Sequence, residues 1–205
     1  FSIKGGSLGK KHAEKICKIM DTAVKIGCPI VGLIDSGGAR IDEGIHALSG
    51  YGQIFMRNVR YSGIVPQISI ILGPCAGGAA YSPALTDFVI MTKDISQLFI
   101  TGPQVIAQVT GQQVTKDELG GWQVHSKKTG LAHLVGNSEQ ETFDLFKKLL
   151  SYLPQNYKDA APTYAPEEQD EEFAAVGATL PGNINQAYDM RSEEHTSELQ
   201  SRLHL

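Results

Sequence analysis

Apolar residues follow two kinds of spacing in the first half of the chain, one typical of helices and one typical of buried strands. Between Lys10 and Gly27 they recur every three or four residues, which predicts an amphipathic helix that ends at Gly27. Short, continuous apolar runs follow, and such runs favour strands that are covered on both faces. Three of these runs occupy residues 29–35, 65–72 and 87–91.

Helical patterns separate the predicted strands. One helix is expected from about Gly44 to Arg60, and a short helix of small residues is expected to start near Gly77. A longer helix should begin at Ser138, where the sequence SEQE has the form of a capping box with Glu141. Strands that alternate with helices indicate βαβ units around a parallel sheet. The predicted fold class is therefore α/β.

The same pattern predicts how the chain is divided. Residues 1–154 carry all of these elements and are expected to form one folded domain. Residues 155–190 are rich in proline and acidic side chains, which is typical of a linker and would also suit the start of a second domain. Residues 191–205 break from this composition and are interpreted as a non-native, adapter-derived tail, with a real amphipathic tail as the alternative.

Composition excludes several function classes. The 205-residue chain has 41% hydrophobic and 20% charged residues and a net charge of −4, so no basic field points to nucleic acid or an anionic membrane. Its three cysteines form no CxxC pair, so no zinc ribbon is expected, and reduced thiols favour a cytoplasmic location. The histidines lack metal-ligand spacing, and no metal site is predicted. No apolar run in the sequence is long enough to span a bilayer.

Two glycine-containing loops, residues 36–40 and 73–78, each follow a predicted strand and are the main candidates for chemistry. Ligands bind beyond the carboxyl ends of parallel strands, so both loops are expected on one rim of the sheet. Backbone N–H groups that point from such loops toward one place form an oxyanion hole. The leading donors are Gly77 and Gly78, with Gly37, Gly38 and Ala39 beside them. The alternative is that these glycines only permit tight turns and close packing.

Polar residues near the loops have open interpretations. Arg40 could hold a phosphate or could order its loop by hydrogen bonds. Asp42 and Glu43 could be solvated or could cap the next helix. Ser82 is expected to pack or cap, because the chain has no GxSxG elbow. The GxGxxG and P-loop phosphate motifs are absent as well.

Five sequence strings carry a family resemblance. They are DSGGAR at 35–40, EG at 43–44, GPCAGGAAYSPALTDF at 73–88, FITGP at 99–103 and ELGG at 118–121. Together they resemble the carboxyltransferase β subunits of biotin-dependent acyl-CoA carboxylases, of the propionyl-CoA carboxylase β and methylmalonyl-CoA decarboxylase α type. The resemblance runs in order from about Ser2 to Met190, and it is specific for the family but not for one member of it.

The resemblance implies a crotonase-like ββα superhelix, of which this chain would be a single truncated domain. It also implies carboxyl transfer between carboxybiotin and the α-carbon of an acyl-CoA, propionyl-CoA or similar, through an enolate held in an oxyanion hole. The amides of Gly77 and Gly78 would form that hole. The acyl-CoA site would be lined by Ser36, Gly37, Gly38, Ala39, Arg40 and Ala76. Which loop faces the thioester and which faces biotin stays open.

In such enzymes the ureido nitrogen of biotin removes the α-proton, so the resemblance requires no side-chain base. Biotin would be carried by a partner protein or domain, because the chain has no AMKM-like biotinylation sequence. The implied partners are a biotin carboxyl carrier, a biotin carboxylase subunit and further copies of the subunit, in dimers assembled to a hexamer. The chain alone is expected to be inactive and to expose an apolar face near residues 44–60 or beside Tyr81.

Three other functions are weighed against this interpretation. A biotin-independent hydratase or isomerase of the crotonase type would need a carboxylate near a glycine loop, and the segment just after Gly78 has none. A non-catalytic scaffold subunit of a carboxylase complex would be expected to have degenerate glycine loops, whereas these are intact. A Clp-type serine peptidase would need a serine where Gly77 stands.

Overall fold

The computed structural model describes residues 2–164, 181–183 and 186. The chain divides into two units, Phe1–Pro162 and Thr163–Leu205, and the helices and strands described below belong to the first. The tail predicted at 191–205, and most of the linker predicted at 155–190, lie outside the described residues.

The first unit alternates helices and strands along the chain. In order, its elements are η1 (Lys4–Gly6), α1 (Lys10–Ile26), β1 (Ile30–Ser36), η2 (Ile41–Glu43), α2 (Ile45–Tyr61), β2 (Gln67–Ala76), α3 (Gly78–Ala84), β3 (Phe88–Thr92), β4 (Gln97–Phe99), α4 (Pro103–Thr110), α5 (Lys116–Gly120), α6 (Trp122–Lys127), β5 (Leu134–Gly136) and α7 (Glu139–Tyr152). In the part of the chain that the structure describes, no helix is both long and apolar enough to cross a membrane.

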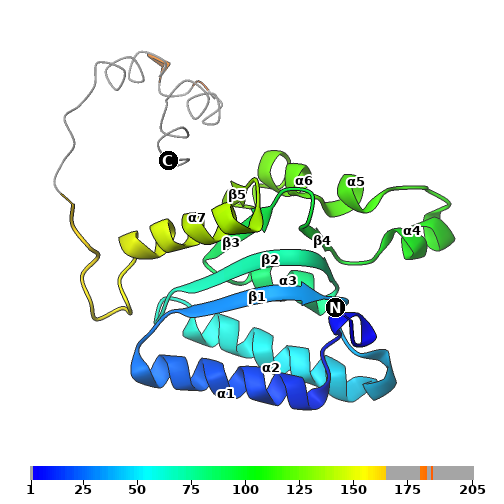
Figure 1. Ribbon diagram of the computed structural model, residues 1–205, viewed down its shortest axis with the longest axis horizontal. Helices are drawn as coiled ribbons and strands as arrows, with labels where there is room; N and C mark the ends of the chain where they lie inside the picture. Colours follow the sequence, from blue (N-terminus) through cyan, green and yellow to red (C-terminus); the bar gives the residue numbers. More distant parts are fainter. Residues whose placement is uncertain (1, 165–180, 184–185, 187–205) are drawn as a thin grey trace. The chain divides into compact units, whose positions relative to one another are not determined.

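The strands form one parallel sheet in the order β1–β2–β3–β5, and β4 pairs with the far end of β2 (Figure 1). β1 and β2 pair in constant register from Ile30 opposite Gln67 to Ile34 opposite Ile71, and the register then shifts so that Ser36 lies opposite Cys75. β4 pairs with Pro74–Ala76, so the ends of β1, β2 and β4 meet at one edge. The predicted parallel strands and the predicted α/β class are confirmed.

Alternate residues of the central strands pack against different helices. On one face, Ile71, Val89 and Met91 share a core with residues of α1 and α2 such as Met20 and Ile54. On the other face, Ile68, Ile70 and Ile90 lie against Phe143, Phe146 and Leu150. Figure 1 shows α1 and α2 on one side of the sheet and α7 on the other. Cover on both faces explains why β2 and β3 read as uniform apolar runs. β1 differs from the prediction: it lies at the edge of the sheet, and Val31 and Leu33 on one of its faces are 38 and 60% exposed.

The predicted helices are present, with one correction at a helix start. Gly27 ends α1 with a φ of 80°, the left-handed conformation that glycine favours at a helix C-terminus. Ser138 caps α7 by accepting a hydrogen bond from the Glu141 amide. The Glu141 carboxylate, however, accepts from the amide of Asn137, 2.9 Å away, and not from that of Ser138. Of the two hydrogen bonds of the predicted capping box, only the one from the Glu141 amide to the Ser138 hydroxyl is therefore formed.

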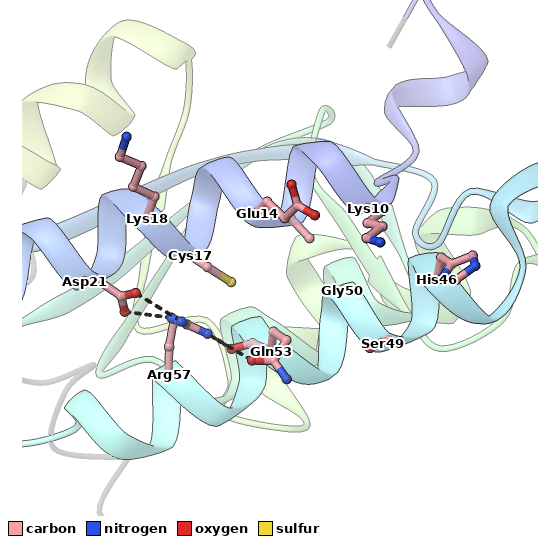
Figure 2. Close-up of a pocket in the computed structure, with 11 residues that line it drawn as sticks. Lys10, Glu14, Cys17, Lys18, Asp21, His46, Ser49, Gly50, Gln53 and Arg57 are labelled. Atoms are coloured by element: carbon pink, nitrogen blue, oxygen red, sulfur yellow. Dashed lines mark hydrogen bonds and ion pairs between the residues drawn. The ribbon is translucent and has the colours of Figure 1, made fainter.

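A polar groove of about 440 Å³ lies between α1 and α2, and an ion pair crosses it (Figure 2). The Arg57 guanidinium donates to both carboxylate oxygens of Asp21, at 2.7 and 3.0 Å, and the Tyr61 hydroxyl donates to the same carboxylate. These hydrogen bonds lower the pKa of Asp21 from an ordinary value of 3.8 to about 2, and the bond from Arg57 has the largest effect. The cluster joins the two helices at the end where α1 leads into β1.

We expect Asp21→Asn to lower the free energy of unfolding by about 1 kcal/mol, since the pair is partly exposed to water. The Asp21 pKa is depressed in the fold, so its contribution is complete above about pH 3.8 and is lost as pH falls through about 2. Denaturant unfolding at pH 7 and pH 3 measures both effects. The control is Asp144→Asn, which removes a more exposed pair with Lys147. Equal losses in the two variants would contradict a specific role for Asp21.

α2 has a second apolar face that points to solvent. Ile45, Leu48, Met56 and Val59 are 77, 62, 43 and 64% exposed, and Ile41 in the preceding turn is 92% exposed. Tyr81, on α3, is 50% exposed. The apolar exposure expected near residues 44–60 and beside Tyr81 is therefore present. Its interpretation as a subunit contact stays a prediction.

Candidate functional site

The two glycine loops lie in contact at one rim of the sheet. They follow β1 and β2, which are neighbouring parallel strands, so both loops leave the sheet at the same edge. Gly38 has a φ of 93°, and a Cβ atom built on it would lie only 2.6 Å from the carbonyl oxygen of Ala76. Any larger residue at position 38 would push the loops apart. The prediction that both loops share one rim is confirmed.

The first loop is held by the N-terminal segment of the chain. The Ser36 hydroxyl donates to the Gly6 carbonyl at 2.8 Å and accepts from the Gly38 amide at 3.2 Å. The Gly37 amide donates to the Gly5 carbonyl at 2.8 Å. The amides of the predicted donors Gly37 and Gly38 are therefore both engaged, Gly37 with the N-terminal segment and Gly38 within the loop. The Ala39 amide has no acceptor among the described residues, so it is the N–H group of this loop that a ligand could use.

The second loop is fixed by the strand beside it. The Gly77 amide donates to the carbonyl oxygens of Phe99 and Ile100, both at 3.1 Å, where β4 ends. Gly78 is the first residue of α3, and its amide has no acceptor in the described part of the chain. First-turn amides of a helix have no partner within the helix and are available to a ligand. Of the two leading donors, Gly77 anchors the turn and Gly78 presents the free N–H group.

Gly78 also rests directly on an aromatic ring. A Cβ atom at this position would lie 2.6 Å from ring atoms of Tyr51, a buried residue of α2. Tyr51 packs against Phe55, whose ring in turn lies 6.1 Å from that of Tyr81. The Tyr51 ring thus limits how closely the start of α3 can approach α2. A side chain at position 78 would push the start of α3 away from this ring.

Arg40 and Glu43 tie the first loop to the start of α1. The Arg40 guanidinium donates to the Ser7 carbonyl at 2.9 Å and to the Glu43 carboxylate at 3.0 Å. Glu43 also accepts from the Lys10 amide at 2.6 Å, and this bond is the main reason that its pKa is lowered. Of the two roles left open for Arg40, these bonds favour ordering of the loop. Glu43 caps α1 and not the helix that follows it, which is where the sequence had suggested a cap.

Cys75 belongs to the second loop but is not a reactive thiol. It is fully buried, and burial raises the pKa of its thiol to about 12. At neutral pH the group is protonated, whereas thiol chemistry requires the thiolate. The rim therefore offers backbone N–H groups, and Cys75 supplies no nucleophile to it.

A second layer of residues holds β4 in place and gives a role to the ELGG string. The Nε2 atom of His125 lies 2.8 Å from the Leu98 carbonyl oxygen, so this nitrogen carries the proton and donates. A Cβ atom at Gly120 would lie 1.9 Å from the same oxygen, so only glycine permits this approach. Glu118 forms a capping box with Thr115 at the start of α5. These contacts fix β4. The carbonyl oxygens of Phe99 and Ile100, at its end, accept the hydrogen bonds of the Gly77 amide.

The structure thus brings Ser36–Arg40 and Ala76–Gly78 together, as the sequence predicted. Sequence reasoning assigned no role to Tyr51, His125 or the carbonyls of Phe99 and Ile100. The FITGP string at 99–103 and the ELGG string at 118–121 lie in or near these segments. Only the pairing of β4 with β2 shows that they hold the second glycine loop in place. The catalytic and binding roles of the loop residues remain predictions at this point.

Comparison with known proteins adds the family. Residues 1–196 match the carboxyl transferase domain. Over 93% of its length the chain is 53% identical to methylmalonyl-CoA decarboxylase subunit alpha of Propionigenium modestum. It is 51% identical, over the same share, to the propionyl-CoA carboxylase carboxyltransferase subunit of Haloferax mediterranei. The chain spans 37% of the length of each of these relatives.

A solved structure shows the same fold. The transcarboxylase 12S structure, described as a hexamer with hydrolysed methylmalonyl-CoA bound, matches with 48% identity and a TM-score of 0.78, over 92% of this chain and 37% of that one. The predicted α/β, crotonase-like fold is confirmed by this likeness and by the parallel sheet. From the rim geometry, the family match and the shared fold together, the chain belongs to the carboxyl transferase domain family.

Proposed function

We propose that the complete subunit carrying this segment transfers a carboxyl group between carboxybiotin and the α-carbon of an acyl-CoA, propionyl-CoA or a similar thioester. The observation that carries the proposal is the pair of glycine loops in contact at one rim, where the amides of Gly78 and Ala39 have no acceptor among the described residues. Membership of the carboxyl transferase domain family supplies the reaction class.

In this proposal the Gly78 amide donates to the thioester oxygen. Removal of the α-proton moves negative charge onto that oxygen, and a fixed N–H group stabilises this charge more than it stabilises the ground state. Gly77 keeps the donor in place through its bonds to Phe99 and Ile100. The first loop, Ser36–Arg40 with Ala76 beside it, lines the thioester from the other side, where the Ala39 amide is a second available donor. Bound carboxybiotin would supply the carboxyl group and accept the α-proton.

The residues present suit such a mechanism. Backbone amides bind a carbonyl oxygen without carrying a charge, so they serve a thioester and a biotin ureido group equally. Residues Gly78–Ala84 of α3 include no acidic side chain, so this helix offers no carboxylate to act as the acid or base of a hydratase. Arg40 is 27% exposed in its side chain and engaged with Ser7 and Glu43, which favours a role in loop order over phosphate binding.

The same proposal includes the partners. Biotin would arrive on a carrier protein or domain loaded by a biotin carboxylase subunit, and copies of the complete subunit would assemble as dimers and then a hexamer. The transcarboxylase 12S structure is itself described as a hexamer, with methylmalonyl-CoA bound in a related structure. The exposed apolar face of α2 would be covered by another subunit. A cytoplasmic location is part of the proposal.

The reverse reaction tests this function without the partner subunits. The complete subunit is incubated with methylmalonyl-CoA labelled in its free carboxyl group and with free biotin as the acceptor. We expect propionyl-CoA to form while the label moves to the ureido nitrogen of biotin. Product separation by chromatography measures both. Label that stays on methylmalonyl-CoA, in a subunit that binds the thioester, would contradict the proposed function.

A further inference from the structure

Tyr51 of α2 contacts both glycine loops from the side of the core. The residue is only 6% exposed, and it packs in the core cluster that also contains Cys75 and Ala79. A tyrosine side chain combines an apolar ring with a polar hydroxyl, so its two ends can hold two different neighbours. Here those neighbours belong to the two loops of the candidate site.

The ring of Tyr51 supports the second loop. A Cβ atom built on Gly78 would lie 2.6, 2.6 and 2.7 Å from the Cδ1, Cγ and Cδ2 atoms of this ring, so the backbone of Gly78 lies directly against it. The Gly78 amide is the proposed donor to the thioester oxygen. The position of the ring therefore decides how far this N–H group lies from α2.

The hydroxyl of Tyr51 holds the first loop. A hydrogen bond joins it to the hydroxyl of Ser36, which also donates to the Gly6 carbonyl and accepts from the Gly38 amide. Ala39, whose amide is the second available donor, follows Gly38 directly. Burial raises the pKa of the Tyr51 hydroxyl, so this group is protonated and uncharged at neutral pH. Its contact with Ser36 therefore persists under ordinary assay conditions.

The helix that carries Tyr51 is itself held firmly. A Cβ atom on Gly50, the preceding residue, would lie 2.7 Å from the Cβ atom of Ala13, so α2 lies directly against α1 at this point. One turn further along α2, the ring of Phe55 lies 5.7 Å from that of Tyr51. Both loops are thus in contact with one side chain that has little freedom to move.

We propose that Tyr51 is a positioning residue, which sets the distance between the two glycine loops and so aligns the Gly78 and Ala39 amides with one thioester. The inference rests on the proposed function, which places the thioester at these amides. Tyr51 acts only through Gly78 and Ser36 and touches no reacting atom. A displacement of about 1 Å in a positioned group can lower the rate by about 10²-fold, so a small shift of either loop has a measurable effect.

The first test measures kcat and KM for propionyl-CoA in carboxyl transfer by the complete subunit. Tyr51→Phe removes only the hydroxyl and should lower kcat by about tenfold, whereas Tyr51→Leu also removes the ring and should lower it by about 10²-fold. KM should change by less than about threefold, because the aligned amides act mainly in the transition state. Tyr61→Phe is the matched control: it removes a hydroxyl from the last residue of the same helix, where the partner is Asp21, and should leave kcat unchanged.

The second test measures amide hydrogen exchange by mass spectrometry, which does not depend on activity. Exchange in residues 36–40 should be faster in Tyr51→Phe, and exchange in both 36–40 and 77–81 should be faster in Tyr51→Leu, whereas Tyr61→Phe should change neither segment. Wild-type exchange in both loops of Tyr51→Leu, or an equal loss of kcat in Tyr51→Phe and Tyr61→Phe, would overturn the inference. Carboxyl transfer by a wild-type subunit whose Tyr51 variants keep full kcat removes only the positioning role. Faster loop exchange in the variants, with no transfer by the wild type, removes only the proposed function.

Discussion

Replacing Gly78 with proline in the complete subunit is expected to lower turnover by about 10²–10³-fold, the usual loss when one oxyanion-hole donor is removed. Proline has no N–H group, and it is well tolerated at the first position of a helix, where that group has no helical partner. Gly78 is the first residue of α3. The substitution therefore removes the proposed donor at a helix position that accepts proline, while the carbon atoms that it adds meet the Tyr51 ring.

Gly78→Ala is the matched control for this experiment. It adds the same Cβ atom, which meets the Tyr51 ring, but it keeps the N–H group. Any loss from the contact with Tyr51 appears in both variants, and the difference between them reports the donor. Thermal unfolding of both shows whether they are folded at the assay temperature. Equal turnover in the proline and alanine variants would show that the Gly78 amide does not act on the reacting oxygen.

The main elements of the fold could be predicted because their signals are local. The β2 run carries its own apolar residues, and α1 carries its own helical spacing and its own glycine stop. β4 could not be found in this way, because its three residues form a strand only by pairing with Pro74–Ala76. α6 is short and likewise depends on contacts with β4, whereas α5 carries a local signal that was overlooked, the capping box of Thr115 and Glu118.

The site was predictable in position but not in detail. Glycines that follow buried strands locate a ligand-binding rim, and the structure places both loops there. Which amides stay free depends on carbonyls from distant segments. Gly77 is engaged by Phe99 and Ile100, and Gly37 by Gly5, and neither bond leaves a mark in the local sequence. Glu43 likewise caps α1, more than thirty residues earlier in the chain, because the fold brings them together.

The 205-residue chain on its own is expected to carry out no carboxyl transfer. The proposed reaction needs an acyl-CoA and a carboxybiotin presented by two domains, and the described residues of this chain form one glycine-loop rim of that kind. It spans 37% of the length of the relatives that it resembles. Binding of acyl-CoA by the chain alone should be weak, because the apolar face of α2 and the rim near Tyr81 are exposed to water.

Transfer of label from radiolabelled bicarbonate to propionyl-CoA measures the central claim most directly. The complete subunit and the 205-residue chain are assayed side by side, each with ATP, a biotin carrier and a biotin carboxylase. Methylmalonyl-CoA that carries the label should form with the complete subunit and should be undetectable with the chain alone. Transfer by the chain at a rate near that of the complete subunit would show that one domain suffices. A folded, complete subunit that binds propionyl-CoA but transfers no label would contradict carboxyl transfer as its function.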